Sequence, residues 1–168
     1  MKGFWLALFL LYFFGASLQG QDDKFKALFM YNFTKYLEWP AEKQSGNFII
    51  GIYGNSNVMG ELAIIAQKRK IGDQTMELRK IYTVQEARNC HILFIPNNRS
   101  AQLNEILKEI SRAGVVVITE SPGMAEKGSG LNYIKTNGNL NFEISKKHLE
   151  QQEVKVNPAL LTLGVLVD

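Results

Sequence analysis

Scarce residue types set the first limits on this chain, which has 1 cysteine, 2 histidines and 4 prolines among 168 residues. Cys90 is alone, so no internal disulfide can form and the hydrophobic core must hold the fold together. His91 and His148 are separated and have no carboxylate at ligand spacing, which argues against a metal site. The sequence also lacks the G-x-S-x-G, H-E-x-x-H and G-x-G-x-x-G patterns of hydrolases, metalloproteases and dinucleotide-binding proteins. We therefore expect a protein that is not an enzyme, with no catalytic residues, no metal and no cofactor.

A strong excess of one charge sign is also missing. The chain has 19 basic and 16 acidic residues, and its formal net charge is +3. The lysines and arginines are scattered, apart from two short clusters at Lys68-Arg69-Lys70 and Lys146-Lys147. Proteins that bind nucleic acid usually carry a basic stripe or patch, so we expect no nucleic-acid partner.

No apolar run in the sequence is long enough to cross a membrane, because about 20 apolar residues are needed to span about 30 Å of hydrocarbon. The longest run, residues 4–14, follows a lysine and is succeeded by small and polar residues up to Gly20. This order is typical of a secretory signal peptide. We expect residues 1–20 to be removed near Gly20, with an uncleaved anchor as the alternative. Residues 21–168 then form a single exported domain.

Apolar patterning in residues 21–168 alternates between strand and helix periods. Continuous apolar runs predict buried strands, spacings of three and four residues predict helices, and Asn137-Gly138 predicts the tight turn of a hairpin. The order of these elements predicts an α/β fold, with a mostly parallel mixed sheet flanked by helices and a C-terminal antiparallel hairpin. The expected strands are residues 48–54, 75–81, 91–95, 115–119, 131–136 and 139–144, and the expected helices are residues 24–39, 58–67, 101–112, 146–151 and 158–165.

The helix expected over residues 24–39 is unusually apolar. Met30, Tyr31 and Trp39 widen its apolar stripe beyond one face, and Pro40 ends the pattern. Two interpretations fit this width. The helix is buried on two sides in its own core, or part of it contacts a partner.

Two loops are candidate binding elements. Residues 124–130 include Gly128, Ser129 and Gly130, and a glycine-rich loop allows close approach of a ligand or partner, although a flexible connector fits equally well. The segment from Gly54 to Gly60 lies where a strand gives way to a helix. It favours either a tight turn or a small-ligand crevice at the carboxyl end of the strand.

Cys90 and His91 are adjacent, but they do not predict a nucleophile and its base. Consecutive residues in a strand point to opposite faces of the sheet, so the two side chains cannot readily meet. We interpret Cys90 as a buried core residue. The alternative is a disulfide between two chains, which would make a homodimer.

Several segments, taken in order, resemble one family. They are Phe25–Pro40 (FKALFMYNFTKYLEWP), Gly51–Gly54 (GIYG), Cys90–Ile95 (CHILFI), Ser121–Ala125 (SPGMA), Phe142–Ser145 (FEIS) and Leu160–Leu163 (LLTL). They span essentially the whole mature chain and resemble the YfiR-like (YfiR/HmsC-like) periplasmic regulator family. Asp73, Ser129 and Ser145 depart from the usual pattern. Because Cys90 has no partner, the disulfides of the best-studied members are not expected here.

The resemblance implies regulation without catalysis in the periplasm. The best-known members repress an inner-membrane diguanylate cyclase by contacting its periplasmic sensor domain, and other members serve membrane-bound sensor kinases. An outer-membrane-associated protein can sequester the regulator, which releases cyclic di-GMP synthesis and promotes biofilm. The alternative that the sequence leaves open is a periplasmic small-ligand sensor or carrier subunit. Carried to this chain, the resemblance gives as candidate partner-binding residues Met30, Tyr31, Trp39, Gly128, Ser129 and Gly130.

Overall fold

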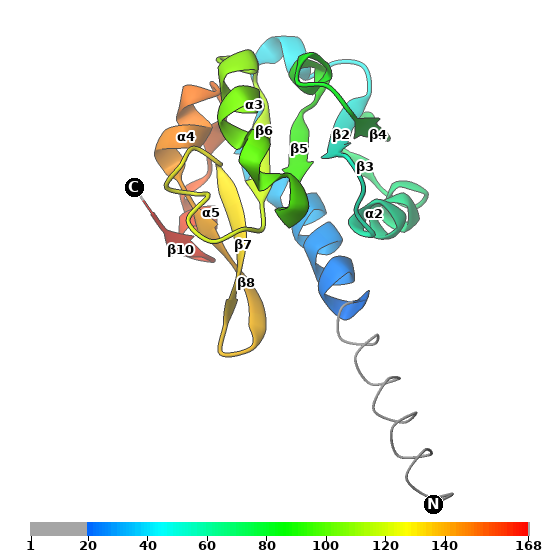
Figure 1. Ribbon diagram of the computed structural model, residues 1–168. Helices are drawn as coiled ribbons and strands as arrows, with labels where there is room; N and C mark the ends of the chain where they lie inside the picture. Colours follow the sequence, from blue (N-terminus) through cyan, green and yellow to red (C-terminus); the bar gives the residue numbers. More distant parts are fainter. Residues whose placement is uncertain (1–19, 168) are drawn as a thin grey trace, which may run out of the picture.

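The computed structural model describes residues 20–167 and contains one mixed eight-stranded sheet (Figure 1). The predicted signal peptide lies outside the described residues, apart from Gly20. The fold class predicted from the sequence, a mostly parallel mixed sheet flanked by helices with an antiparallel hairpin, is confirmed. In spatial order the strands are β10 (Val165–Leu166), β8 (Asn139–Ile144), β7 (Leu131–Thr136), β6 (Val116–Thr119), β5 (Ile92–Ile95), β2 (Phe48–Tyr53), β4 (Gln74–Ile81) and β3 (Lys70–Ile71).

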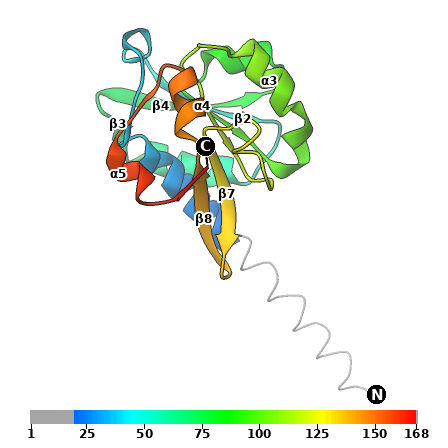
Figure 2. The same ribbon diagram turned by 90° about the vertical axis from the view of Figure 1, so that its left-hand side faces the viewer.

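Helices cover both faces of this sheet. The N-terminal helix (residues 20–33) crosses one face, and α3 (Leu103–Glu109) lies on the other (Figures 1 and 2). The remaining helices are α2 (Val58–Ala66), α4 (Lys146–Gln151) and α5 (Pro158–Leu161), with 3-10 turns η1 (Ala41–Lys43), η2 (Gln85–Asn89) and η3 (Asn97–Gln102).

Strand β5 contributes alternate residues to two separate hydrophobic cores. Ile92 and Phe94 belong to the core beneath the N-terminal helix, while Leu93 and Ile95 belong to the core beneath α3. Alternate residues of a strand point to opposite faces, so a strand covered on both sides must be apolar at every position. This is why a continuous apolar run correctly predicted a buried parallel strand here.

The chain changes direction across the sheet at β2. After β2 it passes through α2 to β4 on one side, and then returns to β5 on the other side of β2. From β5 it continues through β6 to β7. In open α/β sheets a crevice forms at the carboxyl ends of the strands where the order reverses, here beyond β2 and β5.

The helix predicted over residues 24–39 is wrong at its carboxyl end. It ends at residue 33, and two tight hydrogen bonds, from Lys35 N to Asn32 O and from Tyr36 N to Phe33 O, turn the chain. Strand β1 (Leu37–Glu38) then pairs antiparallel with β9 (Lys155–Val156) in a separate two-stranded sheet. Pairing with a distant segment therefore overrides the local helical pattern.

The last predicted helix, over residues 158–165, is also too long. Helix α5 ends at Leu161, and Val165–Leu166 instead forms β10 beside β8. Gly164 allows this path, because a Cβ at this position would lie 2.6 Å from the Phe142 ring.

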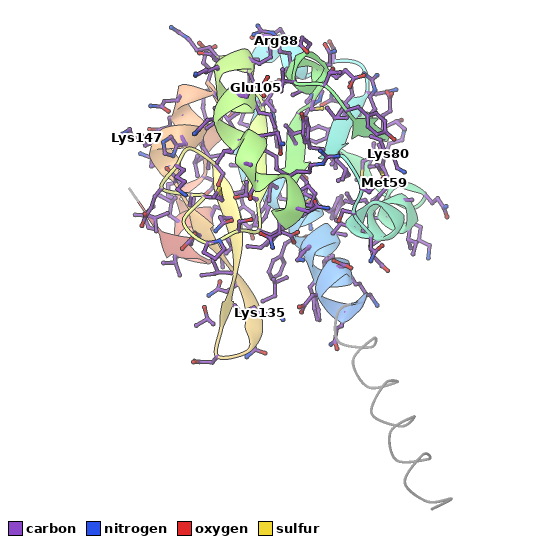
Figure 3. The ribbon with its side chains drawn as sticks, viewed as in Figure 1. Met59, Lys80, Arg88, Glu105, Lys135 and Lys147 are labelled. Carbon is purple, nitrogen blue, oxygen red and sulfur yellow. The ribbon has the colours of Figure 1, made fainter. Side chains whose placement is uncertain are left out.

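The predicted hairpin is confirmed. Asn137 and Gly138 take φ angles of +52° and +80° between β7 and β8. The hairpin projects from the body, with Lys135 on its outer part (Figure 3). An ion pair of 2.6 Å between Lys135 Nζ and Asp22 Oδ2 ties the hairpin to the N-terminal helix.

Candidate partner-binding surface

The N-terminal helix carries two apolar stripes. Ala27, Met30 and Phe33 form the first stripe and are buried in the core. Phe25 and Leu28 form the second, and 39% and 41% of their surfaces remain exposed. A surface helix normally shows polar residues outside its buried stripe. The core of this domain accounts for the first stripe but not for the second.

The three binding residues predicted on this segment differ in burial. Met30 is fully buried, and Trp39 is nearly so. The Trp39 indole Nε1 donates a hydrogen bond of 3.1 Å to the carbonyl of His91, and its ring packs edge-on against Phe48. Tyr31 is half-buried, with the Lys35 ammonium 5.0 Å from its ring centroid. Tyr31 is therefore partly accessible at the surface, whereas Met30 and Trp39 are buried and position the segment from within.

The loop that contains Gly128, Ser129 and Gly130 is packed onto the domain. The Ser129 hydroxyl is buried, accepts a hydrogen bond of 2.9 Å from Thr119 Oγ1 and donates one of 3.1 Å to the carbonyl of Leu131. A Cβ at Gly130 would lie 2.5 Å from the Leu149 side chain.

Gly128 is under a similar constraint, because a Cβ there would collide with Leu107 and its φ is +126°. Close packing of the loop against α3 and α4 therefore explains both glycines by itself, and the explanation needs no partner.

A groove of about 300 Å³ separates the N-terminal helix from α2. Leu28 and Tyr31 line one wall, and Ile64 and Ile65 line the other. Ile64 is 52% exposed, so the apolar surface of the groove is open to solvent. The two walls are distant in sequence, and only the packing of α2 beside the N-terminal helix brings them together (Figure 1).

Cations line both walls of this groove. Lys35 lies in the turn that follows the N-terminal helix, and Lys68 and Arg69 lie just after α2. Among the described residues that line the groove, none carries a carboxylate. Sequence reasoning missed the groove, and the available signal was the cluster Lys68-Arg69-Lys70 directly after the mostly apolar helix α2.

A second, polar hollow of about 360 Å³ lies at the carboxyl ends of β2, β5 and β6. It is lined by residues 55–57, by Asn97 and by Glu120, with Lys26 reaching in from the N-terminal helix. The Lys26 ammonium lies 2.6 Å from Glu120 Oε2, and Glu120 Oε1 accepts a hydrogen bond of 2.9 Å from Asn97 N. This is the position at which the sequence suggested a small-ligand crevice.

The Gly54 turn that leads into this hollow requires glycine. Its φ is +84°, and a Cβ there would lie 3.1 Å from Arg99 Nε. Ser56 Oγ then accepts a weak hydrogen bond of 3.3 Å from Val58 N at the start of α2. The tight-turn interpretation of this segment is therefore correct.

Cys90 and His91 face opposite cores. Burial raises the pKa of the Cys90 thiol to about 11, and the side chain lies in the core beneath α3. His91 stacks on Phe48 in the other core, with 4.4 Å between ring centroids. Its Nδ1 accepts from Ile49 N at 3.0 Å and its Nε2 donates to the carbonyl of Lys43 at 2.8 Å, while burial lowers its pKa. Both residues serve the fold.

Residues 20–167 contain no helix that is long and apolar enough to cross a membrane. Over the same range, no three His, Cys, Asp or Glu side chains are grouped so that they could hold a metal ion.

One solved structure of similar fold is described as the ABC domain in complex with L-Trp from Streptococcus pneumonia. It aligns with a TM-score of 0.52 and 12% sequence identity, over 73% of this chain and 55% of that chain. The present chain thus spans little more than half of that protein, and the similarity concerns the fold alone. No curated protein matches the sequence.

The sequence match identifies a family, whereas the structural match shows only a shared fold. Residues 23–165 match the family described as YfiR/HmsC-like, and the chain belongs to this family. The resemblance drawn from the sequence motifs is confirmed. Membership suggests a periplasmic regulator of cyclic di-GMP signalling, because the family is regulatory and not catalytic.

Proposed function

We propose that this protein is a periplasmic, non-catalytic regulator that binds the sensor domain of an inner-membrane signalling receptor, a diguanylate cyclase or a sensor kinase. An outer-membrane-associated protein that sequesters the regulator fits the same scheme. Family membership supports the signalling role. The contact surface is the exposed stripe of the N-terminal helix together with Tyr31.

One observation carries the proposal. Phe25 and Leu28 stay about two-fifths exposed on a helix whose other apolar stripe is already buried. Exposed aromatic and aliphatic side chains on a rigid helix are typical anchors of protein–protein interfaces. Lys26, between them in sequence, is held by Glu120, so the helix presents its exposed stripe in one fixed orientation.

Regulation requires differential affinity. The protein shifts a receptor between active and inactive states only if it binds one state more tightly than the other. A tenfold preference corresponds to about 1.4 kcal/mol, which a single buried leucine or phenylalanine contact can supply.

The test replaces the exposed anchors by small polar residues. We expect Phe25→Ser and Leu28→Ser to abolish control of the cellular cyclic di-GMP level while the thermal melting temperature stays within a few degrees of wild type. The matched control is Tyr82→Ser, because Tyr82 is 65% exposed and lies outside the N-terminal helix and outside α2. Unchanged control in the two helix variants, with normal expression, would contradict the proposed surface.

A small-ligand sensor is the second candidate, and the polar hollow beside Glu120 favours it. The hollow lies beyond the strand ends where the sheet order reverses, which is where open α/β sheets usually bind ligands. A thermal-shift screen of envelope metabolites tests this candidate. Stabilisation that disappears in Asn97→Ala would support it, and a screen without a stabilising compound would count against it.

A further inference from the structure

We propose that the groove between the N-terminal helix and α2 binds an acidic amphipathic helix of the partner protein. This inference rests on the proposed function, because it assumes that the protein acts by binding a partner. It adds the chemistry of the segment that is bound: an apolar stripe with carboxylates on both sides.

The apolar surface of the groove explains the apolar stripe. Leu28 on one wall and Ile64 on the other are 41% and 52% exposed, and Tyr31 and Ile65 line the same groove but are half-buried. A row of side chains that fills a groove between two packed helices is the usual arrangement when a helix docks into a helical surface. Such a row is supplied by residues spaced three and four apart on one helix.

The cations explain the carboxylates. Lys35 follows Tyr31 by about one turn on one wall of the groove, and Lys68 and Arg69 follow Ile64 and Ile65 on the other wall. A helix lying in the groove would place side chains near the cations of both walls. Acidic residues at those positions would meet a cation on either side, whereas basic residues would be repelled.

These cations make few polar contacts with other described residues. Among the ion pairs of the described residues, none involves Lys35, Lys68 or Arg69. Within residues 20–167, the Lys35 ammonium donates to the Asn32 side-chain oxygen, at 2.9 Å, and lies 5.0 Å from the centroid of the Tyr31 ring. Like charges gathered around apolar surface repel one another, and an acidic partner would relieve this repulsion.

The concave shape favours a protein helix over a membrane surface. A helix that lies on a bilayer inserts its apolar side chains from a convex face. Here the apolar side chains line the walls of a groove between two helices, so a flat lipid surface would reach only the outer edges of Leu28 and Ile64. We therefore assign the groove to a protein segment, and lipid binding becomes an outcome of the test.

The experiment measures binding of a designed helix to the purified protein. The probe is a fluorescent peptide with leucines spaced three and four apart and glutamates on both sides of that stripe. Its matched control has the same leucines with lysine in place of every glutamate. We expect saturable binding of the acidic peptide, an affinity at least about tenfold above that of the basic peptide, and weakening by added salt.

Charge reversal in the protein locates the site. Lys68→Glu with Arg69→Glu should lower the affinity for the acidic peptide by at least about tenfold and raise that for the basic peptide. Lys108→Glu with Lys127→Glu makes the same change of net charge beside the opposite core and should leave both affinities near wild type. Circular dichroism on each variant shows that the fold is intact.

Three results would overturn the inference. They are absence of saturable binding by the acidic peptide, equal effects of the two double variants, and binding to anionic phospholipid vesicles without binding to the peptide. None of these results concerns control of cyclic di-GMP in cells. If the Phe25 and Leu28 variants still lose that control, the proposed function stands and only the groove assignment fails.

Discussion

Lys26 Nζ lies 2.6 Å from Oε2 of Glu120 and joins the N-terminal helix to the end of β6. Only 16% of the lysine side chain and 18% of the glutamate side chain are exposed. The second carboxylate oxygen accepts a hydrogen bond from Asn97 N, just beyond β5. One carboxylate therefore holds three segments together and fixes the helix that we assign to partner binding.

Removing the charge of Glu120 should loosen this connection. In Glu120→Gln the amide oxygen can still accept from Asn97 N, but Lys26 loses its close anionic partner and keeps only Asp23, at 3.6 Å. Because the pair is mostly buried, we expect a loss of about 1–2 kcal/mol in the free energy of unfolding, between the values for exposed and fully buried pairs. Urea denaturation measures it.

The control for this variant is an exposed pair of the same type. Arg112 and Glu153 lie 2.8 Å apart, with 76% and 41% of their side chains exposed. Glu153→Gln should change the free energy of unfolding by less than about 0.5 kcal/mol. Equal losses in the two variants would show that burial of the Lys26–Glu120 pair has no energetic consequence.

Stability should fall as the pH is lowered, because of His91. Its folded-state pKa lies below the ordinary value of 6.5, since burial penalises the charged ring and the nearby Lys43 ammonium repels it. The unfolded chain therefore binds the proton more readily than the folded protein. The stabilising contribution is complete above pH 6.5 and is lost progressively below that value until the folded-state pKa is reached.

A variant that cannot titrate isolates this effect. His91→Asn places an amide oxygen near Nδ1, where it can accept from Ile49 N, and it should be less stable than wild type but with a flatter pH dependence below 6.5. Denaturant midpoints measured across this pH range on both proteins give the comparison. The same slope in both would assign the pH dependence to other groups.

Most of the sheet could be predicted from the sequence, and the reason is visible in its strands. β2, β5 and β6 are covered on both faces, so their continuous apolar runs have one structural interpretation. The hairpin was predictable because Asn137-Gly138 favours the positive φ angles that the turn takes.

The two-residue strands could not be predicted. β1 and β10 are too short to show a period, and each is defined by a partner elsewhere in the chain: Leu37 opposite Val156, and Val165 beside Glu143. The groove was missed for a related reason. Leu28 and Ile64 belong to separate helices, and no local pattern shows which helices become neighbours.

Cys90 should resist thiol reagents in the folded protein. Its side chain is buried, and a pKa of about 11 leaves almost no thiolate at pH 8. We expect no labelling of the native protein by a thiol-reactive dye at that pH and complete labelling in denaturant. Ser45→Cys supplies an exposed thiol as the positive control. Rapid labelling of Cys90 in the native state would contradict the burial and reopen a disulfide between two chains.

Replacing either of two glycines by alanine should change the free energy of unfolding, in opposite directions. Both glycines lie in segments that the sequence suggested for binding. Gly128→Ala forces a Cβ into Leu107 at a φ of +126°, so we expect a loss of about 1–3 kcal/mol in the free energy of unfolding. Gly60→Ala adds a Cβ to α2 with nothing within 4 Å, so we expect a gain of about 0.5–1 kcal/mol from helix propensity. Thermal or urea unfolding of both variants measures the difference. If Gly128→Ala is neutral in stability but abolishes control of cyclic di-GMP, the glycine serves a partner and not the packing of its own loop.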